Sequence, residues 1–89
     1  MSQNLLLFQR LLAKIAESDR TLARNRQFIA EQSDRIMRQE TTGRVSTVSR
    51  QLLTAFFLCR DSHHIHRDRL VRELRQVAGS ELSETLAGE

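Results

Sequence analysis

Large apolar side chains recur at seven-residue intervals through the first half of this chain. The repeated residues are Phe8, Ile15, Leu22, Ile29 and Ile36. A side chain repeated every seven residues returns to the same edge of a helix, where it can pack against a partner helix. A helical wheel over residues 4–40 adds further apolar members to this stripe: Leu11, Leu12, Ala30 and Met37. Polar residues also fall inside it, so we expect polar layers to interrupt the helix contact: Asp19, Arg26 and Ser33.

A second amphipathic pattern occupies residues 45–78. Its period is helical over about nine turns, which predicts a second long helix with one apolar face. The apolar stripe collects Val45, Val48, Leu52, Ala55, Phe56, Cys59, His63, His66, Leu70, Leu74 and Val77. The opposite side bears the charged residues Arg50, Asp61, Asp68, Arg72 and Arg75, which indicates a solvated face.

The stretch between these two segments contains Gly43. Glycine suits the left-handed conformation that ends many helices, and Ser46 or one of the two threonines before the glycine can cap the helix that follows. A turn here would fold helices of about residues 4–40 and 45–78 into an antiparallel hairpin. A single unbroken helix is the competing structure, because one glycine costs a helix only about 1 kcal/mol.

The fold class predicted from these patterns is all-α. The chain lacks proline, the strongest helix breaker, and its β-branched residues form no alternating run typical of a strand. Gly79 and Ser80 predict the end of the second helix and the start of a short acidic C-terminal helix or tail at residues 80–89. Residues 1–79 would then form the helical hairpin.

The size of the chain indicates how the hairpin is stabilised. Eighty-nine residues make one domain with a thin core, and small folds usually need disulfides, a metal or a partner chain. Cys59 is the only cysteine, which excludes a disulfide within the chain and favours a reducing, cytoplasmic location. The apolar runs fall well short of the roughly 18 residues that span a bilayer, so we expect neither a signal peptide nor a membrane partner.

Several apolar residues lie outside the two predicted stripes. If the turn centres near residues 42–43, positions that face each other sum to about 85, which sets Phe28 level with Phe57. Solvating such a cluster is costly, and a second hairpin would cover it in a two-fold symmetric four-helix bundle. Scattered single exposed residues are the alternative. The expected oligomer or partner surface comprises Phe28, Leu53, Phe57, Leu58 and Ile65.

A polar cluster is predicted at the middle of the hairpin. Cys59, His63 and His66 share the second stripe, and Asp19 and Arg26 face them from the first helix. A hydrogen-bonded buried network that fixes register is the favoured interpretation. A Zn²⁺ site with Cys59, His63, His66 and Asp19 as ligands is the second, although the three on one helix span about 10 Å of its axis. A pH-sensitive interface is the third.

The sequence gives little support to catalysis. A thiol on a packed helical seam is usually inert, and a nucleophile needs an accessible cleft with a base. We therefore expect a non-enzymatic protein without a cofactor. The favoured function is a small helical interaction module, a homodimer of coiled-coil type that binds a protein partner.

Arginine supplies the alternative function, and an assembly stabilised by the candidate Zn²⁺ site is the third. The chain has a net charge of +3, and an RNA- or DNA-binding regulator would use arginine-rich helix faces. Acidic residues are interleaved with these arginines, which weakens the prediction, because such mixing is typical of a solvated face. The candidate residues are Arg60, Arg67, Arg69, Arg72 and Arg75.

Overall fold

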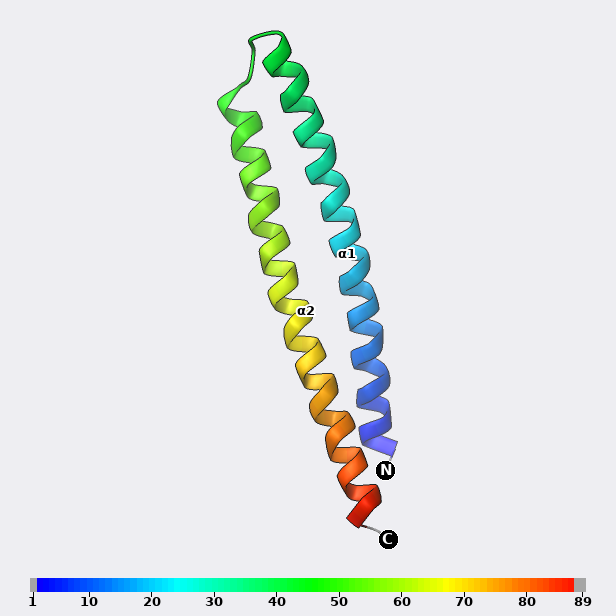
Figure 1. The fold of residues 1–89 in the computed structure, drawn as a ribbon. Coiled ribbons are helices and arrows are strands. Elements are labelled where there is room, and N and C mark those ends of the chain that lie inside the picture. The colour runs from blue at the N-terminus through cyan, green and yellow to red at the C-terminus, as the bar shows by residue number, and fades with distance from the viewer. Residues whose placement is uncertain (1, 88–89) are drawn as a thin grey trace.

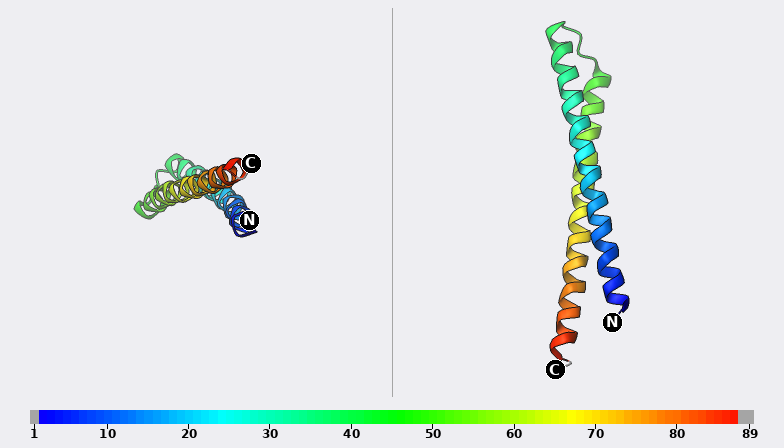
Figure 2. Two further views of the ribbon diagram at one scale, coloured as in Figure 1. Left: turned by 90° about the horizontal axis from the view of Figure 1, so that it is seen from below. Right: turned by 90° about the vertical axis from the view of Figure 1, so that its right-hand side faces the viewer.

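Two long helices joined by a short turn make up the fold. The computed structural model describes residues 2–87, with side chains described for residues 3–80. Helix α1 spans Ser2–Thr41 and helix α2 spans Thr47–Ala87. They run antiparallel and cross at a shallow angle, with both chain termini at the same end (Figures 1 and 2). The predicted all-α hairpin is thus confirmed, and the competing unbroken helix is not formed.

The contact between the helices follows a strict alternation of four-residue and three-residue steps. This spacing is the seam of a coiled coil, in which each helix keeps one edge against its partner. On α1 the buried and half-buried seam residues are Asn4, Phe8, Leu11, Ile15, Ser18, Leu22, Asn25, Ile29, Gln32, Ile36 and Gln39. On α2 they are Ser49, Leu53, Phe56, Arg60, His63, Arg67, Leu70, Leu74 and Val77.

The seven-residue repeat predicted on α1 is confirmed, but Leu12, Ala30 and Met37, which the wheel adds to its stripe, are exposed. Polar layers do interrupt the contact, although at other residues than predicted. The five residues repeated every seven positions all lie on the seam. The polar residues between them are buried Ser18, Asn25 and Gln32, one position before the predicted Asp19, Arg26 and Ser33. Asp19 and Arg26 lie exposed at the rim, because supercoiled helices select alternating steps of four and three rather than a straight wheel.

The stripe predicted on α2 is rotated by one residue in its first half. Leu53 is half-buried on the seam, whereas Leu52 is 40% exposed and Val48 71% exposed. The cause is that α2 carries neighbouring apolar residues, such as Leu52 beside Leu53, and therefore has two apolar edges about 100° apart. A two-helix hairpin covers only one of these edges.

The turn contains a complete helix stop followed by a helix start. Gly43 has a φ of 73°, and the amides of Gly43 and Arg44 donate to the carbonyls of Glu40 and Gln39 at 3.0 and 2.8 Å. This pair of hydrogen bonds is the Schellman arrangement that closes a helix C-terminus. The Ser46 hydroxyl accepts from the Ser49 amide at 3.0 Å and caps α2.

Helix α2 continues through the position where the sequence predicts a stop. It shows no break at Gly79 and Ser80 and runs on to Ala87, so a separate short C-terminal helix does not form. A glycine inside a helix costs only about 1 kcal/mol, which continued helical hydrogen bonding offsets. Residues 81–87 therefore extend the rod, while the side chains of the acidic tail lie outside the described residues.

The hairpin is a thin rod with little interior. It measures 71 × 14 × 14 Å, and its radius of gyration is 20.2 Å, against about 12 Å for a compact domain of this length. Its accessible surface is 7004 Å², against about 5,400 Å² for a compact monomer of this mass. Among the described side chains only Leu11, Leu22, Ile36 and Leu70 are buried apolar residues, and none is fully enclosed.

Candidate functional site

Large apolar side chains remain exposed along the rod. They include two predicted partner-surface residues on the side of α2 that faces away from α1, Leu58 and Ile65, with exposed fractions of 64% and 59%. Phe28 and Phe57, also predicted there, are 44% and 36% exposed, whereas the fifth, Leu53, belongs to the seam. The full exposed set is Leu5, Leu6, Leu7, Leu12, Phe28, Met37, Val48, Leu52, Phe57, Leu58 and Ile65.

The second apolar edge of α2 is the most continuous of these exposed features. It consists of Val48, Leu52, Ala55 and Cys59, all exposed, and we call it the outer stripe. Its steps of four, three and four residues repeat the spacing of the buried seam. Such spacing is the pattern by which a helix packs against another helix, so α2 carries one used and one unused packing edge.

Phe28 of α1 joins the outer stripe from the neighbouring helix. Its ring stacks on Phe56 with centroids 5.7 Å apart and an interplanar angle of 22°. An open hollow at this level is lined by both rings and by Cys59, which places Phe28 and the outer stripe on one side of the rod. The sequence instead predicts Phe57 at the level of Phe28. The Phe57 ring is not part of this stack, and the Arg60 guanidinium lies 4.9 Å from its centre.

The polar layer predicted around the histidines does not form as one unit. His63 is half-buried, but Cys59 and His66 are exposed. Asp19 is engaged by Arg67, whose Nε donates to its carboxylate. Among residues 2–87, no three His, Cys, Asp or Glu side chains are placed to hold one metal ion. The structure therefore does not bring together the candidate zinc ligands Cys59, His63, His66 and Asp19.

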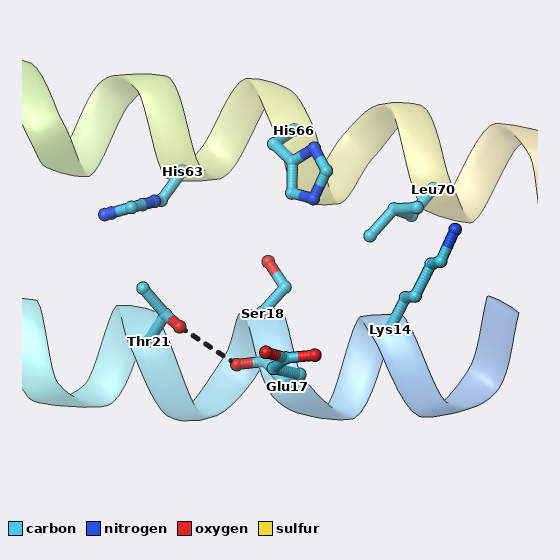
Figure 3. Close-up of a pocket in the computed structure, with 7 residues that line it drawn as sticks. All are labelled: Lys14, Glu17, Ser18, Thr21, His63, His66 and Leu70. Carbon is cyan, nitrogen blue, oxygen red and sulfur yellow. Dashed lines mark hydrogen bonds between the residues drawn. The ribbon is translucent and has the colours of Figure 1, made fainter. Parts of the chain in front are cut away.

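Both imidazoles nevertheless lie beside one open hollow between the helices. Figure 3 shows His63 and His66 on the α2 side, with Thr21, Ser18 and Lys14 on α1 below them. The Thr21 hydroxyl donates to the Glu17 carbonyl within its own helix at 3.1 Å. The hollow combines a cation, two imidazoles and a carboxylate, since Glu17 also lines it, so its charges are mixed.

Besides the Asp19–Arg67 pair, the polar contacts at the seam come from residues that the sequence prediction missed. The Gln32 amide donates to the Ser49 carbonyl at 3.0 Å, and Arg35 donates to the Gln32 side-chain oxygen at 3.1 Å. The Asn25 amide donates to the Phe56 carbonyl at 3.4 Å, while its own Oδ1 is buried without a partner. The recurrence of Ser18, Asn25 and Gln32 every seven residues was the signal that could have revealed them.

The candidate nucleic-acid arginines divide into two groups. Arg67 is half-buried, and the hydrogen bond that it donates to Asp19, followed by the negative charge of that carboxylate, raises the pKa of the guanidinium above its ordinary value. Arg60 is also half-buried, and it contacts Asp61 at 3.4 Å as well as the Phe57 ring. Arg69, Arg72 and Arg75 are exposed. The five predicted residues thus do not form one free basic face.

Comparisons with known proteins add no functional information to the geometry described above. No family model, curated protein or solved structure matches the chain. Neither helix, over residues 2–87, has an apolar stretch long enough to cross a lipid bilayer.

Proposed function

We propose that this chain is a non-enzymatic helical interaction module that acts by self-association, pairing two hairpins into a four-helix bundle with two-fold symmetry. The observation that carries the proposal is the outer stripe, a second helix-packing edge that the hairpin does not cover. Four-helix bundles bury such edges against facing helices in the same spacing of four and three residues.

The energetics of the thin rod support this assignment. A large apolar side chain contributes roughly 1.5–3 kcal/mol when it passes from full exposure to burial. Of the side chains at residues 3–80, only four apolar ones are buried, whereas Val48 and Leu52 of the outer stripe remain exposed. The rod also exposes about 1,600 Å² more surface than a compact monomer of equal mass. A second hairpin would bury the exposed apolar side chains of the outer stripe, and a copy of the same chain provides the matching surface.

The mass in solution tests this proposal. Light scattering coupled to size-exclusion chromatography should give twice the chain mass of 10.3 kDa, with dissociation on dilution. Mass rather than elution volume is the required readout, since a rod 71 Å long elutes early even as a monomer. A helical species that stays at the monomer mass at concentrations on the order of 100 μM, where even weak associations with micromolar Kd are populated, contradicts the proposal.

A further inference from the structure

We infer that the second copy docks antiparallel on the side of the rod formed by the outer stripe and Phe28, with the two-fold axis passing close to Phe28. This inference rests on the proposed self-association and adds the face, the direction and the register. The apolar centre of the face consists of Phe28 from α1 with Val48, Leu52, Ala55 and Cys59 from α2.

The packing geometry singles out this side of the rod. Cys59 and Phe28 line the same hollow, so α1 and α2 contribute to one surface. Leu52 lies seven residues before Cys59 and therefore on the same edge of α2. Leu58 and Ile65 are also exposed, but they project from another side of α2, because one residue along a helix turns the side chain by about 100°. That side faces away from α1. At the outer stripe, α1 and α2 of one hairpin can therefore both pack against the helices of a second hairpin.

Charges on α1 supply the direction. Five exposed residues on one edge of the helix alternate in sign at seven-residue intervals: Arg10, Glu17, Arg24, Glu31 and Arg38. Neighbours in this series are about 10 Å apart along the axis, too far for intrahelical pairs. When α1 lies antiparallel on its own copy, Glu17 meets Arg38 and Arg24 meets Glu31. An antiparallel axis between residues 20 and 21 would also pair opposite charges, Glu17 with Arg24, but it lies at the polar residues Arg20 and Thr21. The axis between residues 27 and 28 lies at the exposed Phe28 ring, so we place the centre of the dimer there.

Existing contacts leave the four charges of these pairs available. Arg38 pairs with Asp34 at 3.0 Å, but its side chain is 81% exposed. Glu31 accepts from Gln27 at 3.2 Å, also on the exposed surface. Exposed pairs of this kind exchange partners at little cost. A parallel alignment of the same helix edges would set like charges at the same level, so the series specifies direction as well as affinity.

The available area reaches the range of a stable dimer. One side of a rod 71 Å long and 14 Å wide is about 1,000 Å² in projection. A standard protein interface buries about 800 Å² on each partner. Two hairpins docked about an axis near Phe28 overlap over residues 14–41 of α1, about 42 Å of the axis, so the shared face is about 600 Å² in projection on each partner. This area lies at the lower end of the range for stable interfaces.

A matched pair of substitutions tests the face. Leu52→Glu places a charge on the outer stripe, and Leu58→Glu makes the same change six residues along the same helix but off the stripe. We expect Leu52→Glu to raise the dimer Kd by at least about 100-fold and Leu58→Glu to change it less than about threefold. Circular dichroism at high concentration checks that both variants remain helical. A dimeric wild type that Leu58→Glu disrupts and Leu52→Glu does not refutes the face while leaving self-association intact.

A charge exchange tests the register. Arg24→Glu or Glu31→Arg alone turns two attractive contacts of the dimer into repulsive ones, and each should weaken association about tenfold. The double variant restores opposite charges across the interface and should return the Kd to within about threefold of the wild type. Since these two positions do not touch within one chain, recovery reports contact between copies. Additive weakening in the double variant refutes the register.

Distance between labels tests the direction. A spin label on Gln9→Cys, in a Cys59→Ser background whose dimer mass is first verified, lies about 18 residues from the proposed axis. The antiparallel dimer therefore predicts a separation of about 55 Å, whereas parallel rods predict less than about 30 Å. A single short distance overturns the antiparallel arrangement. A wild type without any dimer overturns the proposed function instead, so the two failures are distinguishable.

Discussion

Two kinds of layer alternate along the seam between α1 and α2, and they contribute differently to the fold. Leu11, Leu22 and Leu70 form dry layers whose side chains are no more than 6% exposed. Asn25 and Gln32 form polar layers that are equally buried but bind backbone carbonyls of α2. Apolar layers tolerate a slip of one heptad, whereas a side chain bonded to a particular carbonyl does not. The difference indicates that the dry layers supply stability and the polar layers supply register.

Removing a dry layer should have the largest effect. Leu22→Ala deletes most of a side chain that is 2% exposed, and such truncations cost about 2–5 kcal/mol. Urea denaturation at fixed protein concentration measures the loss, because association couples stability to concentration. Leu58→Ala on the exposed side of α2 is the control, with an expected change within about 0.5 kcal/mol. Similar losses for both would mean that the seam is not the core.

Replacing a polar layer sharpens the comparison. In Asn25→Leu the buried Oδ1 that lacks a partner is removed and apolar burial is added, so we expect the free energy of unfolding to rise by about 1–2 kcal/mol. Gln32→Leu breaks satisfied contacts with Ser49 and Arg35 and should gain less. We expect both variants to relax the register, seen as extra amide signals in NMR spectra. A loss of stability in Asn25→Leu larger than in Gln32→Leu would contradict this ranking.

The turn offers a second source of register, which can be weakened separately. Ser46→Ala removes the oxygen that caps α2, at an expected cost of about 1 kcal/mol in the free energy of unfolding. Thr47→Ala, one residue along, is the control without a capping role. If the polar layers set the register, the NMR spectrum of Ser46→Ala keeps one set of signals. Multiple conformers would assign register to the turn instead.

The ion pair at the rim should have the smallest effect. Asp19→Asn removes the carboxylate that holds Arg67, and both side chains are substantially exposed to solvent, where such pairs contribute little. We expect no resolvable change in the urea midpoint at neutral pH. The raised pKa of Arg67 adds stability that is lost only as pH rises above the ordinary arginine range. A neutral-pH transition in stability would therefore have another origin.

The sequence predicted the fold well and the site only in part. Five apolar residues at seven-residue spacing sufficed for the seam of α1, and Gly43 with Ser46 sufficed for the turn. Along α2, neighbouring apolar residues such as Leu52 and Leu53 give two edges of similar hydrophobicity. Which edge turns inward depends on the facing side chains of α1, among them Phe28, which stacks on Phe56. A pattern within one helix does not contain that information, so Cys59 and His66 are predicted on the wrong edge, whereas His63 lies on the seam as predicted.

The small thickness of the rod has a consequence for the protein in a cell. Because no described side chain is fully enclosed, little apolar burial opposes the opening of a solitary hairpin, and opened segments are the ones that proteases cleave. If two hairpins dock as proposed, the cellular concentration of the chain sets its rate of degradation. Above the dimer Kd most copies are paired and protected, and below it most copies are monomeric and degraded. Expression level would then act as a threshold switch, without any ligand or modification.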